Sequence, residues 1–170
     1  MEIGGNGIEQ WERIWTPHRK EYLTAMAGQF DDKSCPFCRA IAGDDDLVVV
    51  RREHAYVVLN KFPYNNGHLL VCTNRHVALY DELTEREALD VQHLTQQAMR
   101  TLRVTAGCTG FNIGLNQGRV AGAGVQDHFH QHVVPRWAND SNFMPIVAGT
   151  KVISELLEQT RDLLVERWCH

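Results

Sequence analysis

Three histidines alternate with other residues at positions 128, 130 and 132, in the segment His-Phe-His-Gln-His-Val-Val. Successive side chains of a β-strand point to opposite faces, so a strand here would place the three imidazoles on one face. Such close rings repel one another when protonated, so only some would carry charge near neutral pH. A metal site and a nucleophilic imidazole helped by its neighbours are both consistent with this pattern. A plain His-rich surface strand is disfavoured, because two valines follow before Pro135.

A glycine-rich loop leads almost directly into the histidine segment. Residues 116–124 read Asn-Gln-Gly-Arg-Val-Ala-Gly-Ala-Gly. Glycines let backbone N–H groups approach an anion closely, and the Asn116 and Gln117 amides add further donors. Beside three histidines, this loop favours a phosphate-binding site that includes Gly122 and Gly124.

The elements that must position these residues follow from hydrophobic periodicity and turn signals. Thr84 and Glu87 form a capping box, and a long amphipathic helix with buried Val91 and Leu94 is expected to run from there to Gly107. A short helix is expected over 35–43, and a C-terminal amphipathic helix uses Ile153, Leu156, Leu157, Thr160, Leu163, Leu164 and Trp168. Strands are expected near 47–51, 55–59, 68–72, 111–115 and 128–134, the last stopped by Pro135. This order indicates an α+β fold with an antiparallel sheet.

Length and composition limit the class of protein. The chain has 170 residues, enough for one domain, with 44% apolar and 22% charged residues. A net charge of −4 disfavours a duplex-DNA binder, so no specific nucleic-acid partner is expected. No apolar run is long enough to span a membrane, and the N-terminus lacks the pattern of an export signal. A cytoplasmic protein is therefore expected.

The histidine segment resembles the active-site motif of the histidine-triad family, His-x-His-x-His followed by two apolar residues. Asn60, His68 and Asn116 fall where that family places groups that contact phosphates and the nucleotide. Further matches make the chain similar to the family's prokaryotic branch of diadenosine tetraphosphate phosphorylases: Trp15-Thr16-Pro17, 60–65 and Val134-Pro135-Arg136-Trp137. Two positions depart from the pattern: Gln131 replaces a usually apolar residue, and Gly124 replaces a serine common among relatives.

The resemblance implies an antiparallel five-stranded sheet with a long helix, a short helix and a C-terminal helix. It divides the chain into an N-terminal aromatic arm (1–34), a catalytic domain (35–137) and a C-terminal extension packed on that domain (138–170). It also implies a homodimer or higher homo-oligomer whose sheets join across subunits.

The resemblance also implies a mechanism. His130 would attack the α-phosphorus of a dinucleoside polyphosphate and form a nucleotidyl-histidine intermediate, which phosphate then releases. His132 would contact phosphates or protonate the leaving group, His68 and Asn116 would bind phosphate oxygens, and Asn60 would bind sugar or phosphate. Hydrolysis of dinucleoside polyphosphates or nucleoside phosphoramidates is the alternative within the family. A non-catalytic nucleotide-binding regulator is the alternative outside it.

Cys35 and Cys38 supply half of a common zinc pattern, and two histidines would complete the tetrahedron. His76 and His128 are the candidates, an arrangement similar to zinc-containing histidine-triad proteins. The zinc would be structural and would fix the nucleophile strand from one side. Two reduced cysteines packed near a helix start are the alternative.

Overall fold

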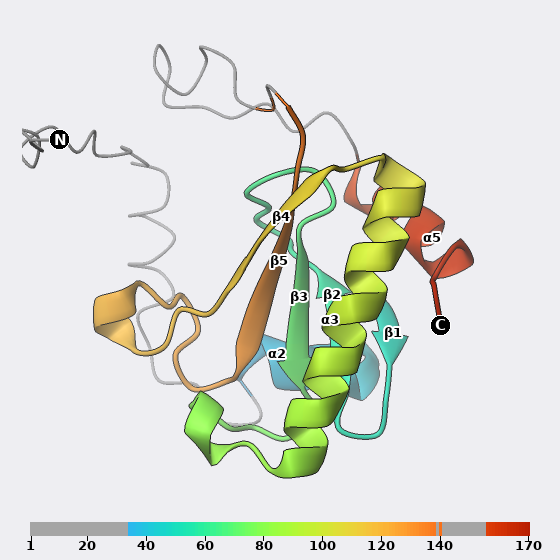
Figure 1. The fold of residues 1–170 in the computed structure, drawn as a ribbon. Coiled ribbons are helices and arrows are strands. Elements are labelled where there is room, and N and C mark those ends of the chain that lie inside the picture. Colours follow the sequence, from blue (N-terminus) through green and yellow to red (C-terminus); the bar gives the residue numbers. More distant parts are fainter. Residues whose placement is uncertain (1–33, 139, 141–155) are drawn as a thin grey trace, which may run out of the picture.

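The computed structural model describes residues 34–138, 140 and 156–170, so the expected aromatic arm lies, apart from Ser34, outside the described residues. A five-stranded antiparallel sheet forms its centre, with strand order β1-β2-β3-β5-β4 (Figure 1). The strands are β1 (Val48–Arg51), β2 (Ala55–Leu59), β3 (Leu69–Thr73), β4 (Gly110–Gly114) and β5 (His130–Arg136). The expected fold class, including the five strands and three helices, is confirmed.

The two faces of the sheet carry different helices (Figure 1). The long helix α3 (Glu85–Ala106) packs on β2, β3 and β5, and the short helix α2 (Pro36–Arg39) lies on the opposite face. Thr84 caps α3 through the predicted capping box with Glu87, and Gly107 ends it in a left-handed conformation with φ of 61°. Local sequence signals therefore set both ends of the longest helix.

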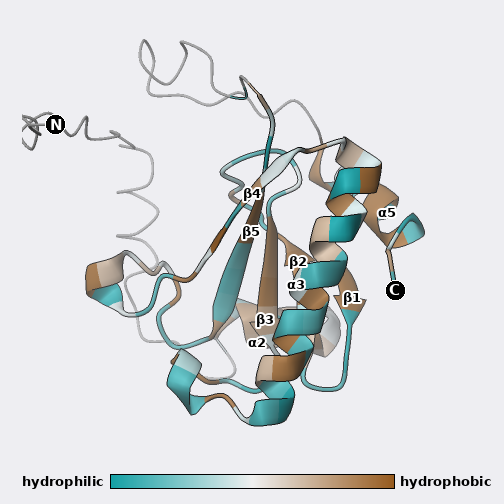
Figure 2. Ribbon diagram, in the orientation of Figure 1, coloured by the Kyte–Doolittle hydropathy of each residue, from teal (hydrophilic) through white to brown (hydrophobic). Residues whose placement is uncertain are grey.

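The register of β5 decides which of its side chains face the site. His130 lies opposite Cys72 and His132 opposite Leu70, both on the face away from α3. Gln131 points the other way and donates to Thr95 Oγ1 of α3 at 2.7 Å. This hydrogen bond accounts for a polar residue at a usually apolar position. Figure 2 shows the result as a hydrophilic first half of β5 beside a hydrophobic β3.

The bounds predicted for the histidine strand are wrong at both ends. The strand begins at His130 rather than His128, whose ring is directed to a cysteine cluster instead of the sheet face. It also continues through Pro135, which pairs with Phe111 of β4. Pro135 is tolerated because the pairing of β5 with β3 ends at Val133, so no ladder partner is lost on that side.

The two remaining helical segments differ in detail from expectation. The helix predicted over 35–43 is α2 followed by a π-helical turn, η1 (Ala40–Asp44). The C-terminal helix α5 (Leu157–Glu166) packs against β1 and α3, with Leu164 buried and Leu163 exposed. Leu156, which is exposed, and Trp168, which is buried, were expected on this helix but lie just outside its bounds. Ile153 lies outside the described residues. Short 3₁₀ turns, η2 (Tyr80–Glu82) and η3 (Arg119–Ala121), complete the list. Among the described helices none has the length and apolarity to cross a membrane.

Candidate functional site

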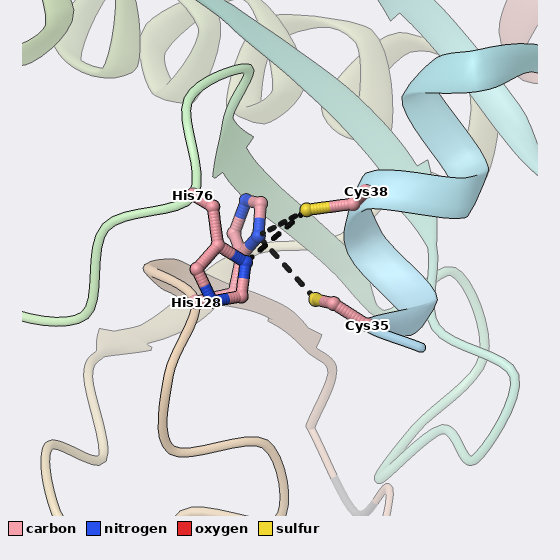
Figure 3. A group of neighbouring side chains, drawn as sticks. All are labelled: Cys35, Cys38, His76 and His128. Carbon is pink, nitrogen blue, oxygen red and sulfur yellow. Dashed lines mark hydrogen bonds between the residues drawn. The ribbon is translucent and has the colours of Figure 1, made fainter. Parts of the chain in front are cut away.

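Two cysteines and two histidines from three separate segments meet beside the start of β5 (Figure 3). Cys35 is the N-cap of α2 and Cys38 lies within that helix, His76 follows β3, and His128 precedes β5. One ligand atom from each lies within 4.8 Å of the others. His128 Nδ1 is 3.5 Å from Cys35 Sγ and 3.4 Å from Cys38 Sγ, and His76 Nδ1 is 3.2 Å from Cys38 Sγ.

These distances fit a tetrahedral metal ion. Zinc bonds of about 2.3 Å to sulfur and about 2.0 Å to nitrogen place sulfur and nitrogen ligands about 3.5 Å apart at a tetrahedral angle. The imidazole of His128 is also oriented for ligation, because its Nε2–H donates to the Thr73 carbonyl at 2.8 Å. That bond leaves Nδ1, the nitrogen facing the thiols, as the ligand atom. The structure therefore holds a Cys₂His₂ cluster able to bind a metal.

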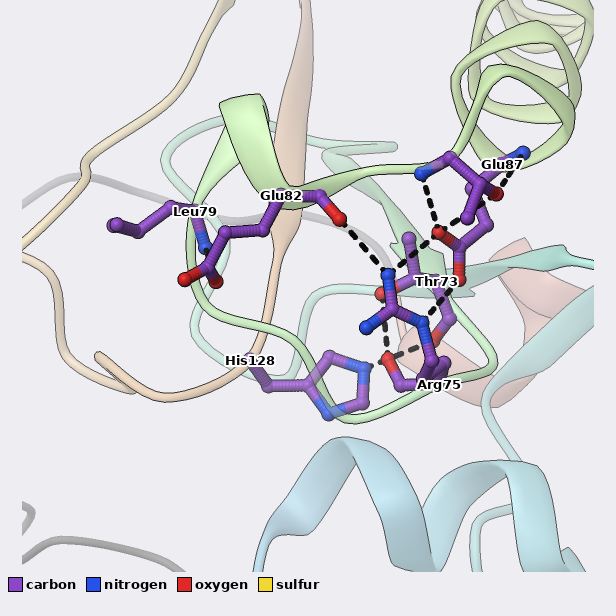
Figure 4. Close-up of polar contacts among 7 residues, drawn as sticks. Thr73, Arg75, Leu79, Glu82, Glu87 and His128 are labelled. Atoms are coloured by element: carbon purple, nitrogen blue, oxygen red, sulfur yellow. Dashed lines mark hydrogen bonds and ion pairs between the residues drawn. The ribbon is translucent and has the colours of Figure 1, made fainter.

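Polar contacts behind the cluster tie it to α3 (Figure 4). Thr73, whose carbonyl accepts from His128, donates its hydroxyl to the Arg75 carbonyl at 2.9 Å. Arg75 then forms two hydrogen bonds of 2.8 Å to the carboxylate of Glu87, which is buried. This guanidinium is the main reason why the pKa of Glu87 falls to about 2. The turn carrying His76 is thus anchored to the first turn of α3.

His130 is held in one orientation beside the cluster. Its Nδ1–H donates to the His128 carbonyl at 2.8 Å, so Nε2 carries the lone pair. The residue is only 8% exposed, and this burial lowers its pKa below the ordinary value. A neutral imidazole with a defined lone pair can act as a nucleophile.

His132 and His68 form a hydrogen-bonded pair at the far side of His130. His68 Nδ1 accepts from the Tyr64 N–H at 3.0 Å, so its Nε2–H donates to His132 Nδ1 at 3.0 Å. A neutral His132 then carries its proton on Nε2. Burial, helped by the neighbouring imidazoles of His132 and His130, lowers the pKa of His68 to about 3. His68 is therefore neutral near pH 7, and both of its nitrogens are engaged within the protein.

Other residues expected in the site surround this pair or lie in the glycine loop. The Asn60 amide nitrogen is 3.2 Å from His68 Nδ1, and its oxygen accepts from the Phe62 N–H. Asn116 follows β4, whose last residue, Gly114, lies opposite His132. Gly122 ends η3 with φ of 81°, and Gly124 is half-buried four residues before His128.

A surface groove among the described residues lies elsewhere. It is lined by Glu53, His54, Asn74, Arg75 and the first turn of α3. It contains none of the residues expected to bind nucleotide or metal. Contacts among the histidines, rather than this groove, define the candidate site.

A sequence model of the HIT domain family matches residues 43–139. The chain belongs to the HIT, or histidine-triad, family. It is 41% identical over 167 residues to proteins named AP-4-A phosphorylase from two strains of Mycobacterium tuberculosis, covering 94% of this chain and 86% of each relative. An uncharacterized HIT-like protein of Mycoplasma genitalium, MG132, is 32% identical and spans 78% of this chain and 93% of its own length.

Solved structures agree on the fold. A Zn-bound histidine triad family protein from Mycobacterium smegmatis superposes with a TM-score of 0.66 at 24% identity, over 81% of this chain and 94% of the other. A hypothetical histidine triad nucleotide-binding protein from Sulfolobus tokodaii superposes with a TM-score of 0.65 at 25% identity, over 78% of this chain and 91% of the other. The recognition of the family from its motif is confirmed.

Two aromatic residues next to the histidines went unnoticed in the sequence. Phe37 lies with its ring centroid 4.9 Å from that of His130, and Tyr64 stacks at 5.5 Å on His132. Phe37 lies between the two cysteines and Tyr64 four residues before His68, so nearness to the motifs was an available signal. The Arg75–Glu87 pair was also missed, although Glu87 was recognised as a capping residue.

Proposed function

We propose that this HIT protein is an enzyme that cleaves dinucleoside polyphosphates, such as diadenosine tetraphosphate, by phosphorolysis. The enzymatic class rests on the family and on relatives named AP-4-A phosphorylase along almost the whole chain. The observation that carries the chemistry is the hydrogen bond from His130 Nδ1–H to the His128 carbonyl. It leaves Nε2 as the nucleophilic nitrogen beside the His68–His132 pair.

In the first step, His130 Nε2 forms a bond to the α-phosphorus. The bond from that phosphorus to its bridging oxygen breaks, and the leaving nucleoside triphosphate takes the electron pair. His132 donates a hydrogen bond from its Nε2–H to this leaving oxygen and keeps the proton. One such donor aimed at developing charge is typically worth about 10²–10³-fold in rate.

In the second step, an oxygen of inorganic phosphate attacks the same phosphorus. The nitrogen–phosphorus bond breaks, and His130 Nε2 recovers its electron pair. His132 keeps its Nε2 proton in both steps and hydrogen-bonds the oxygens around this phosphorus. Diadenosine tetraphosphate and phosphate therefore give ATP and ADP.

His68 serves in this mechanism as a positioning residue rather than a phosphate ligand. His68 Nδ1 accepts a hydrogen bond from the Tyr64 N–H, and His68 Nε2–H donates one to His132 Nδ1. The role of His68 is therefore to fix which His132 nitrogen carries the proton. Asn60 supports the same nitrogen of His68. We assign phosphate binding to the loop that contains Asn116, Gly122 and Gly124, because it follows the end of β4 opposite His132.

We propose that the Cys₂His₂ cluster holds a structural zinc. Cys35, Cys38, His76 and His128 would be the four ligands, leaving no position for substrate. Bound zinc would cross-link α2 to the loops before β5 and after β3. Thiolate ligands require reduced cysteines, and all five cysteines are free thiols, which supports the cytoplasmic location we propose.

We also propose a homodimer formed through β4. This strand is the last in the sheet order, and within the described residues its Asn112, Ile113 and Gly114 are exposed. An edge strand with an apolar side chain is a template for pairing with a second copy. Light scattering of the wild type and of Ile113→Lys tests this: a wild-type monomer would contradict it.

The functional test compares products formed with and without inorganic phosphate. Phosphorolysis of diadenosine tetraphosphate gives ATP and ADP, whereas hydrolysis gives ATP and AMP. We expect ADP when phosphate is present, and no turnover by His130→Ala. Normal turnover by His130→Ala would refute the role of the nucleophile, and AMP formation regardless of phosphate would identify a hydrolase.

A further inference from the structure

The ring of Phe37 contacts both the metal cluster and the nucleophile. Its centroid lies 5.4 Å from that of His128 and 4.9 Å from that of His130, where the two planes differ by only 32°. Phe37 comes between the two cysteine ligands, and the sulfurs of Cys35 and Cys38 both face His128. Besides the hydrogen bond from His130 to the His128 carbonyl, the Phe37 ring therefore gives a second route by which a change at the metal cluster can reach His130.

The backbone of Phe37 is held from two sides. Its carbonyl accepts from the hydroxyl of Tyr56, a fully buried residue of β2, at 2.7 Å. The cysteines on either side would be bound to the metal. A four-residue helix such as α2 has little stability of its own, so these anchors determine where Phe37 lies.

His130 needs such a contact to keep its ring plane. The hydrogen bond to the His128 carbonyl fixes which nitrogen is protonated, but the outer torsion of a histidine side chain is broad. Phe37 covers one side of the ring, and His132 meets it edge-on at 5.4 Å. A nucleophile displaced by about 1 Å can lose about 10²-fold in rate, so the ring plane matters to attack on phosphorus.

We propose that Phe37 is a positioning residue through which the metal cluster holds the His130 ring in its attacking orientation. The inference rests on the proposed function for its effect on rate. Its structural part, the coupling of metal occupancy to His130 order, is independent of any substrate. Loss of metal releases α2, Phe37 leaves the ring, and His130 samples other orientations.

The test uses Phe37→Ala and Phe37→Leu in the full chain, with Phe111→Ala and Phe111→Leu as matched controls. Phe111 is a half-buried phenylalanine of β4 that contacts Arg103. Elemental analysis first establishes the metal content of each variant. NMR of the ¹³C-labelled His130 ring then reports its order, since exchange between orientations broadens or splits the signal.

We expect one sharp His130 signal in the metal-loaded wild type and broadening on chelation of the metal. Phe37→Ala should show the same broadening while it keeps its metal, and Phe37→Leu and both controls should stay sharp. With the dinucleotide, kcat of Phe37→Ala should fall about 10- to 100-fold with KM changed less than about threefold.

A sharp His130 signal in Phe37→Ala and in the metal-free wild type would overturn the proposal. A loss confined to KM would also overturn it, because Phe37 would then act by contacting substrate. Absence of dinucleotide turnover in the wild type would refute the proposed function instead. The NMR comparison would still decide whether the metal cluster orders His130.

Discussion

The pair formed by Arg75 and Glu87 gives the most quantitative prediction. Glu87→Gln removes the carboxylate charge but keeps a side chain that suits the third position of a capping box. Folding lowers the pKa of Glu87 from an ordinary 4.5 to about 2. At roughly 1.4 kcal/mol per pKa unit, this shift limits the free energy of unfolding that Glu87→Gln can lose to about 3 kcal/mol. Arg75 is 50% exposed, so solvent screening reduces the expected loss to about 1–2 kcal/mol.

The pH dependence follows from the direction of the shift. Because folding lowers the pKa of Glu87, its contribution is complete above the unfolded value near 4.5 and is lost as pH falls towards about 2. The gap in unfolding free energy between wild type and Glu87→Gln should therefore be constant from pH 7 to about 5.5, narrow as pH falls further, and close only below about 2. Protonation of the metal ligands affects both proteins and cancels in the difference.

Urea unfolding at several pH values measures this gap, with metal content kept equal. Glu85→Gln is the control, because Glu85 is an exposed carboxylate in the same first turn of α3. This control should reproduce any general effect of charge at the helix N-terminus, but it should lower the free energy of unfolding by less than about 0.5 kcal/mol. Equal losses for the two variants, or a gap that does not change with pH, would refute the assigned role of the Arg75 contact.

Three further predictions concern packing and metal. Gln131→Leu and Thr95→Val should each lower the free energy of unfolding, measured in urea, by about 0.5–1.5 kcal/mol, because each removes the Gln131–Thr95 hydrogen bond. The double variant should lose less than the sum, because that bond can be lost only once; strict additivity would contradict a direct contact. Gly67→Ala should lower the free energy of unfolding, measured in urea, by about 1–2 kcal/mol more than Gly107→Ala does. Both glycines have a positive φ, but only at Gly67 would the added Cβ lie 3.0 Å from the Leu102 side chain. A metal chelator should lower the thermal midpoint of the wild type by several degrees, and Cys38→Ser should abolish that response; an unchanged wild-type midpoint would exclude a structural metal.

Local signals were sufficient for much of the fold. The capping box at Thr84 and the glycine at 107 placed both ends of α3, and a valine-rich run placed β2 at its observed bounds. These signals work because they depend on neighbours within a few residues. The four cluster residues were also predicted: the spacing of Cys35 and Cys38 indicated half of a zinc site, and the resemblance to zinc-containing histidine-triad proteins supported His76 and His128.

Contacts between distant segments could not be read in the same way. Strand alternation predicted that His128 would share a face with His130, but the cysteines of α2 draw its ring into the cluster and delay the start of β5. The prediction that Pro135 stops the strand was wrong, because this proline lies where β5 no longer pairs with β3. Each error arose where tertiary pairing overrides a local rule.

The position of His128 explains how a ligand of the proposed metal and the proposed nucleophile can lie two residues apart in the chain. Its Nδ1 faces the thiols, its Nε2–H is held by Thr73, and its carbonyl accepts from His130. One residue therefore links the cluster to the choice of protonated nitrogen on His130, whereas Phe37 links the same cluster to the plane of that ring. Any change that moves His128 affects both, while a change at Phe37 affects only the plane. The two routes are separable by experiment, because the first alters which nitrogen of His130 is protonated and the second only broadens its signal.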